Sequence, residues 1–315
     1  MFGRVSSPAQ LFFQSNDGRP RPSTRIWGFC YRMRLVFMRF GEGNQTFMKT
    51  NIRVLALVAL AALALSSVGC NKLRARDQLN KGVASYKNAR YEQAVEHFKN
   101  AVNLDPGLAN AKIYLAAAYV AQYIPGVDSP ENLQNANNAI SQYEAVLQQD
   151  PKNVNAVKSL AGLYFQMKKF DDAKKYNQMA IQLDANDPEA YYSIGVIDYW
   201  KLFTPMQEER SKAGLKPDES LKDKKLCASL REKDGPTLQE GLDSLNKAMQ
   251  LRQDYDDAMA YMNLLYRQKA DRECDQPDDA SQDRKTADDW LDKAMAARKE
   301  KAEKAASAPQ GITNQ

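Results

Sequence analysis

Histidine and cysteine are scarce in this 315-residue chain, which has one of the former and four of the latter. The single histidine, His97, excludes a metal site built from several histidines and a catalytic histidine pair. No two cysteines have the Cys-x-x-Cys spacing of zinc ribbons and thioredoxins. We therefore expect no metal, no cofactor and no catalytic residue, and we interpret His97 as a residue of a helix surface.

Carboxylates are abundant, but none stands in a pattern typical of catalysis. The densest stretch is formed by Asp271, Glu273, Asp275, Asp278 and Asp279. Its neighbours are polar, so we expect a solvated loop without the apolar surroundings that raise the pKa of a catalytic acid. The sequence therefore predicts that the protein is not an enzyme.

Acidic residues are rare only near the N-terminus. Residues 1–69 contain nine lysines or arginines against two acidic residues, whereas the whole chain has a net charge of +5. The remainder therefore carries a net charge of −2. The excess of basic residues lies in residues 1–69, and the pattern of this segment, described next, indicates an export signal. Because the remainder has no positive net charge, we expect no nucleic-acid partner.

A long hydrophobic run is also missing, since a membrane-spanning helix needs about 20 apolar residues. The longest run covers residues 54–65, all Val, Leu or Ala. It follows the basic segment 48–53 and precedes the small residues 66–69. A basic start, a short apolar core and small residues at the end are typical of a secretory signal peptide. We predict that residues 48–69 are such a peptide, with an uncleaved anchor as the alternative.

Val68-Gly69-Cys70 resembles the lipobox of bacterial lipoproteins, although Ser67 stands where leucine is commonest. The resemblance implies that the chain is cut before Cys70 and that this residue is lipidated, with palmitate-like acyl chains. Several chains on one residue hold a protein firmly at a membrane. Asn71, in place of the aspartate that retains lipoproteins at the inner membrane, implies the outer membrane. We expect a lipid-anchored protein of the bacterial cell envelope that faces the periplasm.

Residues 1–47 mix arginine, proline, glycine and phenylalanine without a sustained period. A signal peptide begins at its own methionine, and Met48 stands at that place. We therefore expect that residues 1–47 are not part of the native protein, because the start is mis-assigned, or are disordered. Residues 70–77 are predicted to be the lipidated N-terminus and linker, and residues 306–315 a flexible tail.

The rest of the chain repeats a pattern of small and bulky residues. Alanines seven apart, as in Ala94/Ala101 and Ala173/Ala180, lie on one face of a helix. The spacing recurs at positions 139/146, 241/248 and 287/294. Four residues after the first member, a bulky side chain stands in four of the five copies: Phe98, Tyr143, Leu245 and Leu291. Five recurrences indicate an internal repeat.

Each copy follows a segment with a large-small pair, such as Leu160-Ala161 or Ile194-Gly195, and Asp105-Pro106 and Asp150-Pro151 end two of the second helices. This pattern resembles the tetratricopeptide repeat family over about residues 75–305. The resemblance implies an all-α fold in which residues 78–305 form a right-handed α-α superhelix of about five helix pairs.

Three of the repeats are longer than the family pattern. The extra residues lie near 123–135, 202–236 and 270–284, and we expect them to form loops at one edge of the array. Neutral loop growth and a role in partner choice remain open. Cys227 and Cys274 fall in adjacent insertions of an exported protein, so we predict a disulfide between them, with two unpaired thiols as the alternative.

In this family the first helix of each pair lines a concave face. The resemblance places these residues in the groove: Tyr86, Val120, Phe165, Tyr192, Val196, Tyr199, Trp200 and Arg267. Aromatic and arginine side chains dominate binding hot spots, although packing against neighbouring helices would also explain them. We expect a scaffold that binds a peptide or protein partner. The alternative is an accessory lipoprotein in the assembly of outer-membrane proteins, pili or secretion systems.

Overall fold

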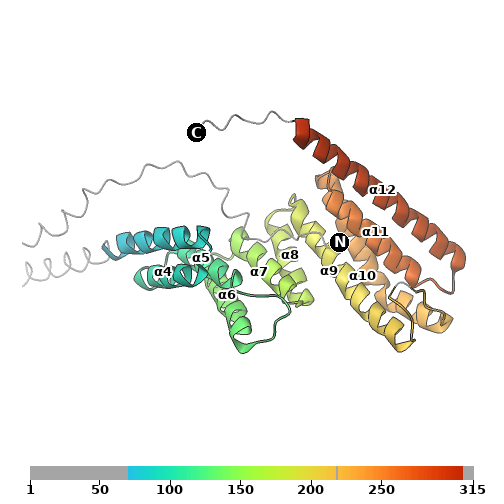
Figure 1. Cartoon of the computed structure of the whole chain (residues 1–315), viewed down its shortest axis with the longest axis horizontal. Coiled ribbons are helices and arrows are strands. Elements are labelled where there is room, and N and C mark those ends of the chain that lie inside the picture. Colours follow the sequence, from blue (N-terminus) through green and yellow to red (C-terminus); the bar gives the residue numbers. More distant parts are fainter. Residues whose placement is uncertain (1–69, 218, 308–315) are drawn as a thin grey trace, which may run out of the picture. The chain divides into compact units, whose positions relative to one another are not determined.

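The computed structural model describes residues 70–217 and 219–307 (Figure 1). The predicted signal peptide, the residues before it and residues 308–315 lie outside the described residues. The chain divides after Ala121 into two compact units, and each is described by itself. Within the described ranges both units consist of helices, turns and loops without a β-strand. The predicted all-α, α-α superhelical fold class is confirmed.

In the first unit, residues 70–87 are helical and are followed by α4 (Tyr91–Leu104) and α5 (Ala109–Val120). The helix reaches back to Cys70, so residues 70–77, predicted to be the lipidated N-terminus and linker, are helical. A Cβ atom at Gly82 would lie 2.4 Å from Cε1 of Phe98 on α4. Only glycine allows this approach, which is the packing of small on bulky residues that the repeat pattern predicts.

The second unit contains seven labelled helices in its described part. They are α6 (Pro130–Gln149), α7 (Val154–Gln166), α8 (Phe170–Leu183), α9 (Pro188–Lys212), α10 (Lys224–Leu251), α11 (Asp256–Asp271) and α12 (Pro277–Ser307). Each helix packs against the next, and α9 also packs against α11. The first helices of the last two pairs, α9 and α11, are therefore neighbours.

Side-chain caps fix where several helices begin. The Ser129 hydroxyl accepts a hydrogen bond from the Asn132 N–H at the start of α6, and the Asn153 side chain accepts one from the Ala156 N–H in α7. Asp223 accepts two, from residues 225 and 226, at the start of α10. Each cap satisfies N–H groups that have no partner inside the helix.

The longest insertion is mostly helical, whereas the sequence predicts a loop with a helix only near residues 222–233. α9 runs through Pro205 as far as Lys212, and α10 begins at Lys224 and runs through Pro236. Only the short stretch 213–223 links them. The third insertion behaves similarly, because α11 and α12 leave only residues 272–276 between them. We call residues 202–236 the helical extension.

A small core of its own explains why the helical extension continues past two prolines. Met206, Leu221, Cys227 and Leu230 are buried against one another. A proline inside a helix costs about 3 kcal/mol, and the burial of one large apolar side chain contributes about 1.5–3 kcal/mol. Tertiary burial therefore overrides the local preference to end the helix.

Two side chains depart from the predicted repeat pattern. Leu291 is 40% exposed, although the four other alanine columns flank a buried residue. α12 packs along α11, and Ala287 and Ala294 on either side of Leu291 are buried while Leu291 itself is not. On α9, Asp198 is buried and its carboxylate pairs with Lys174 of α8 at 2.7 Å. Lys174 also contacts Glu240 of α10 at 2.8 Å, so this lysine joins three helices.

Candidate functional site

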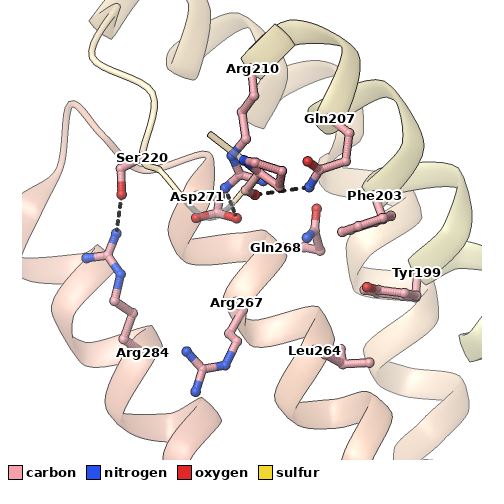
Figure 2. Close-up of a pocket in the computed structure, with 11 residues that line it drawn as sticks. Tyr199, Phe203, Gln207, Arg210, Ser220, Leu264, Arg267, Gln268, Asp271 and Arg284 are labelled. Carbon is pink, nitrogen blue, oxygen red and sulfur yellow. Dashed lines mark hydrogen bonds and ion pairs between the residues drawn. The ribbon is translucent and has the colours of Figure 1, made fainter. Parts of the chain in front are cut away.

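One cavity of the second unit has a volume of about 260 Å³ and lies between α9, the linking stretch 213–223, α11 and α12. Figure 2 shows α9 on one side and α11 and α12 on the other, with the linking stretch above. We call it the extension pocket, because the helical extension forms its roof. Its lining combines an apolar wall with several arginines.

The apolar wall consists of Tyr199 and Phe203 on α9 and Leu264 on α11. The rings of Tyr199 and Phe203 stack with centroids 5.4 Å apart. Tyr199 also meets Tyr261 edge-on at 5.6 Å, which holds its ring in place. Burial raises the pKa of Tyr199 to about 12. The wall is therefore a fixed aromatic surface, and the tyrosine stays neutral.

Arg210 anchors the roof. Its guanidinium donates to Asp271 Oδ2 on α11 at 2.6 Å and to the backbone carbonyl of Glu219 at 2.8 Å. Gln207, one turn earlier on α9, donates to the carbonyl of Pro217 at 3.3 Å. The linking stretch is thus held over the pocket by two side chains of α9, and the charges of Arg210 and Asp271 compensate each other.

Arg272 is a buried residue that stabilises the lining of the pocket from the protein interior. This guanidinium is only 1% exposed, and it donates to Asp234 Oδ2 of the helical extension at 2.8 Å. It also donates to the carbonyl of Leu202 on α9 and to both the carbonyl and the side-chain oxygen of Gln268. Gln268 lines the pocket, so a buried arginine fixes the position of a lining residue.

A disulfide and an ion pair fasten the helical extension to the turn after α11. Cys227 and Cys274 are joined in the structure, with Cα atoms 5.9 Å apart. Arg231 donates to both carboxylate oxygens of Asp275, at 2.6 and 2.9 Å. Such two-point pairs add geometric specificity. The pocket therefore depends on contacts between segments that are distant in the sequence.

The carboxylate-rich stretch 271–279 is only in part the solvated segment that the sequence suggested, because Asp278 and Asp279 are exposed but Glu273 is 4% exposed. Glu273 lies beside Asp283 of α12 and Lys269 of α11. Burial, and next the contact with Asp283, raises the pKa of Glu273 to about 7. Glu273 and Asp283 line neither cavity, whereas Asp271 lines the extension pocket.

The predicted groove residues fall into three groups. Tyr199 and Arg267 line the extension pocket, and Tyr192 and Trp200 belong to the aromatic cluster beside it. Val196 is 3% exposed, so it contributes to the core and has no surface for a partner.

The remaining three predicted residues lie elsewhere. Phe165 is half-buried on α7 and contacts Phe170. Tyr86 and Val120 belong to the unit that ends at Ala121. The structure therefore unites only the predicted residues of α9 and α11.

Sequence reasoning missed several lining residues. On α9 these are Phe203, Gln207 and Arg210, and on the other segments Ser220, Gln268, Asp271 and Arg284. Residues 199, 203, 207 and 210 are three or four apart, so the sequence already indicates that they share one face of a helix. Pro205 obscures this signal, because a proline suggests that the helix has ended.

Other predicted features have these positions. Cys70 is a half-buried residue at the start of the described chain, and its lipidation stays a prediction. His97 lies on α4 with Nδ1 2.9 Å from Gln78 Oε1.

Among the described residues, no group of three or more His, Cys, Asp or Glu side chains is placed to hold a metal ion. No helix in residues 70–217 and 219–307 has the length and apolar character needed to cross a membrane.

Comparison with known proteins gives a family match and several similar folds. A sequence model of the tetratricopeptide repeat family matches residues 133–194. No curated protein matches the chain. A crystal structure of MamA protein is similar with a TM-score of 0.48 and 15% identity, over 73% of this chain and 94% of MamA. MamA 41-end from Desulfovibrio magneticus RS-1 gives 0.49 and 14%, over 72% and 96%.

A third similar structure is the first TPR of Spaghetti (RPAP3) bound to the HSP90 peptide SRMEEVD. Its TM-score is 0.33 at 20% identity, over 38% of this chain and 86% of that one.

The family match extends from α6 to the first turns of α9, and the packing pattern continues outside it. Gly82 lies against Phe98 before the match, and Gly195 lies against Leu245 after it. On both sides of the matched segment, a small residue of one helix therefore packs against a bulky residue of the next helix. Residues 133–194 therefore match the tetratricopeptide repeat family, and the same helix packing is present before and after them.

Proposed function

We propose that the protein is a lipid-anchored scaffold of the bacterial cell envelope that binds a protein or peptide partner. The aromatic face that α9 and α11 present beside the extension pocket is the observation that carries this proposal. Tyr192, Tyr199 and Trp200 of α9 gather there around Tyr261 of α11. These residue types combine a large apolar contact area with a polar tip, which suits them to binding surfaces.

The geometry of this aromatic face supports binding with a small entropic cost. The ring of Tyr261 lies 5.7 Å from that of Tyr192 and 5.6 Å from that of Tyr199, both in edge-on arrangements. Trp200 meets Tyr199 edge-on at 5.5 Å and remains half-buried. Because the rings already hold one another, few rotamers are lost when a partner binds.

The pairing of charges supports binding rather than catalysis. Arg210 and Asp271, the closest charged groups in the pocket, neutralise each other at 2.6 Å. Burial moves the pKa of Tyr199, which also lines the pocket, upward and away from neutrality. A general acid or base works best with a pKa near the working pH, so this tyrosine is poorly suited to that role.

Membrane attachment through Cys70 completes the proposal. The lipobox-like sequence supports it, and the described residues are helical from Cys70 to residue 87. Acyl chains on Cys70 would hold the first helix pair at the membrane surface without a linker. Labelling with radioactive palmitate tests this directly. We expect label in the wild type and none in Cys70→Ser, which is released from the membrane fraction; label retained in Cys70→Ser would refute the anchor.

Partner binding is tested by photo-crosslinking in intact cells. A photoreactive amino acid replaces Gln207 or Arg267, which line the pocket without belonging to the core. The matched control is Gln178, an exposed residue of α8, which is the second helix of its pair and does not line the pocket. We expect one reproducible adduct from positions 207 and 267 and none from 178. Equal adducts from all three positions, or none at all, would contradict a partner site on this face.

A further inference from the structure

Basic side chains gather at the start of the described chain. In the first three turns of its helix, Lys72, Arg74 and Arg76 are positively charged and exposed, and the single carboxylate is that of Asp77. Asp77 pairs with Lys81 at 2.8 Å, so it neutralises none of the three. The three basic side chains form no ion pair within the described part of the chain. Their charges are therefore available to an anionic surface.

An exposed leucine lies among these charges. Leu73 is 53% exposed, and it stands between two basic residues in the sequence. Leu73 and Arg74 are three and four residues after Cys70, so the three side chains share one side of the helix. A single exposed leucine needs no explanation by itself. A leucine combined with flanking basic residues is typical of a helix that lies in a membrane interface.

Contacts with α4 determine which way this side of the helix points. Gln78 Oε1 lies 2.9 Å from Nδ1 of His97, and Gly82 packs against α4 as well. Ala75 shares the face of Gln78 and Gly82 and is completely buried. Figure 1 shows this helix alongside α4. Leu73, two residues before Ala75, therefore points away from α4.

The position of this exposed side favours a membrane as its partner. A helix rises about 1.5 Å per residue, so Leu73 and Arg74 lie within about 6 Å of Cys70 along the helix axis. Acyl chains on Cys70 would bring lipid headgroups to that distance, which is shorter than the screening length of about 8 Å at physiological salt. Anionic headgroups would then meet basic side chains that are not neutralised by the protein.

We infer that this side of the first helix docks on a bilayer with anionic lipids, with Leu73 between the headgroups and with Lys72, Arg74 and Arg76 at the lipid phosphates. The inference rests on the proposed attachment at Cys70 and adds a second contact to it. Each basic side chain at an anionic surface strengthens binding about fivefold. The docked side therefore holds the first helix against the membrane, whereas acyl chains alone would leave it free to turn.

Vesicle cosedimentation tests this contact without any acyl chain. The protein is the chain from residue 70 onward with Cys70→Ser, which keeps every other residue that the structure describes. The vesicles contain phosphatidylcholine alone or equal parts of phosphatidylcholine and phosphatidylglycerol, at low ionic strength, because salt screens the attraction. This chain has a net charge of −2, so any attraction to the anionic vesicles is local. We expect binding to the anionic vesicles only; equal binding to both, or to neither, overturns the inference.

Two matched double variants locate the contact. Lys72→Gln with Arg74→Gln removes two charges from the docking side, and Lys87→Gln with Arg90→Gln removes the same residue types from the far end of the helix and the turn after it. We expect the first double variant to bind about 25-fold more weakly, because each charge contributes about fivefold. The second should bind as the starting protein does. Equal losses in the two variants overturn the inference.

Leu73→Ala distinguishes a membrane from an acidic protein surface, which would be attracted by the charges alone. We expect several-fold weaker binding to the anionic vesicles, because the apolar side chain no longer enters the interface. Leu133→Ala is the control, since Leu133 of α6 is also exposed, and it should have no effect. Unchanged binding of Leu73→Ala overturns docking on the bilayer. Palmitate labelling reports on Cys70 separately, so the proposed anchor can hold where the docking fails.

Discussion

A Cβ atom at Gly195 of α9 would lie 2.5 Å from Cγ of Leu245 on α10, and Leu245 is completely buried. At this point the two helices of the longest repeat pack too closely for a larger side chain. Gly241 of α10 is similarly close, since a Cβ there would lie 3.1 Å from Cβ of Asp198 on α9. Two helices of 25 and 28 residues are thus in register through two glycines.

Gly195→Ala is expected to destabilise the protein. The added methyl group forces Leu245 out of its place, and overpacking of this kind costs about 1–3 kcal/mol. Urea unfolding followed by circular dichroism measures the change. Gly235→Ala is the control, because Gly235 is also helical and a Cβ there meets nothing within 4 Å. Alanine is the better helix former by about 0.5–1 kcal/mol, so the control should be more stable than the wild type.

The repeats could be predicted from the sequence because their determinants are local. A small residue such as Gly195 and a bulky one such as Leu245 recur at spacings that a helix imposes, whatever the rest of the chain does. The pairing of Cys227 with Cys274 could be predicted for a related reason, since adjacent repeats place equivalent insertions side by side. The structure joins the same two cysteines.

The extension pocket could not be predicted because its determinants are not local. Pro205 and Pro236 are helix breakers by propensity, and only the burial of Met206 and Cys227 in a separate core keeps their helices intact. The partner of Arg272 is Asp234, 38 residues earlier in the chain. Nothing in the spacing of these residues indicates that they meet.

Arg272→Met is expected to destabilise the second unit strongly. The change removes the donor to Asp234, whose side chain is 14% exposed, and to the Leu202 carbonyl, and it leaves both acceptors without this partner. Breaking a buried pair in this way costs about 3–5 kcal/mol. Arg298→Met is the matched control, because Arg298 is half-exposed where it pairs with Asp256, and it should cost at most about 1 kcal/mol. Comparable unfolding midpoints for the two variants would show that Arg272 is not an anchor.

The disulfide is expected to stabilise the helical extension more than the repeats. Cys227 and Cys274 close a loop of 47 residues, and loss of such a bridge costs about 2–4 kcal/mol. Replacing both by serine should increase amide hydrogen exchange in residues 202–236 while α7 and α8 stay protected. Peptide-resolved exchange by mass spectrometry measures this, and the wild type in reductant provides the same comparison without mutation. Uniform deprotection of all helices would mean that the bridge supports the whole unit.

Glu273 should make stability depend on pH between about 4.5 and 7. Burial beside Asp283 raises the pKa of Glu273 to about 7, from an ordinary value of 4.5, and Lys269 only partly opposes this. The folded state therefore binds a proton that the unfolded state has already lost in this range. The stabilising contribution is complete below the unfolded pKa and is lost as the pH rises through the folded one.

Glu273→Gln keeps the neutral shape of the protonated acid and removes the titration. We expect the variant to be more stable than the wild type at pH 8 and close to it at pH 4.5, with the difference growing across the interval. Thermal unfolding at a series of pH values measures it. Asp289→Asn, an exposed carboxylate on the same helix as Asp283, should give a difference that does not change over this range. If the difference between the Glu273→Gln variant and the wild type were equally flat, the pKa of Glu273 would not be raised in the folded protein.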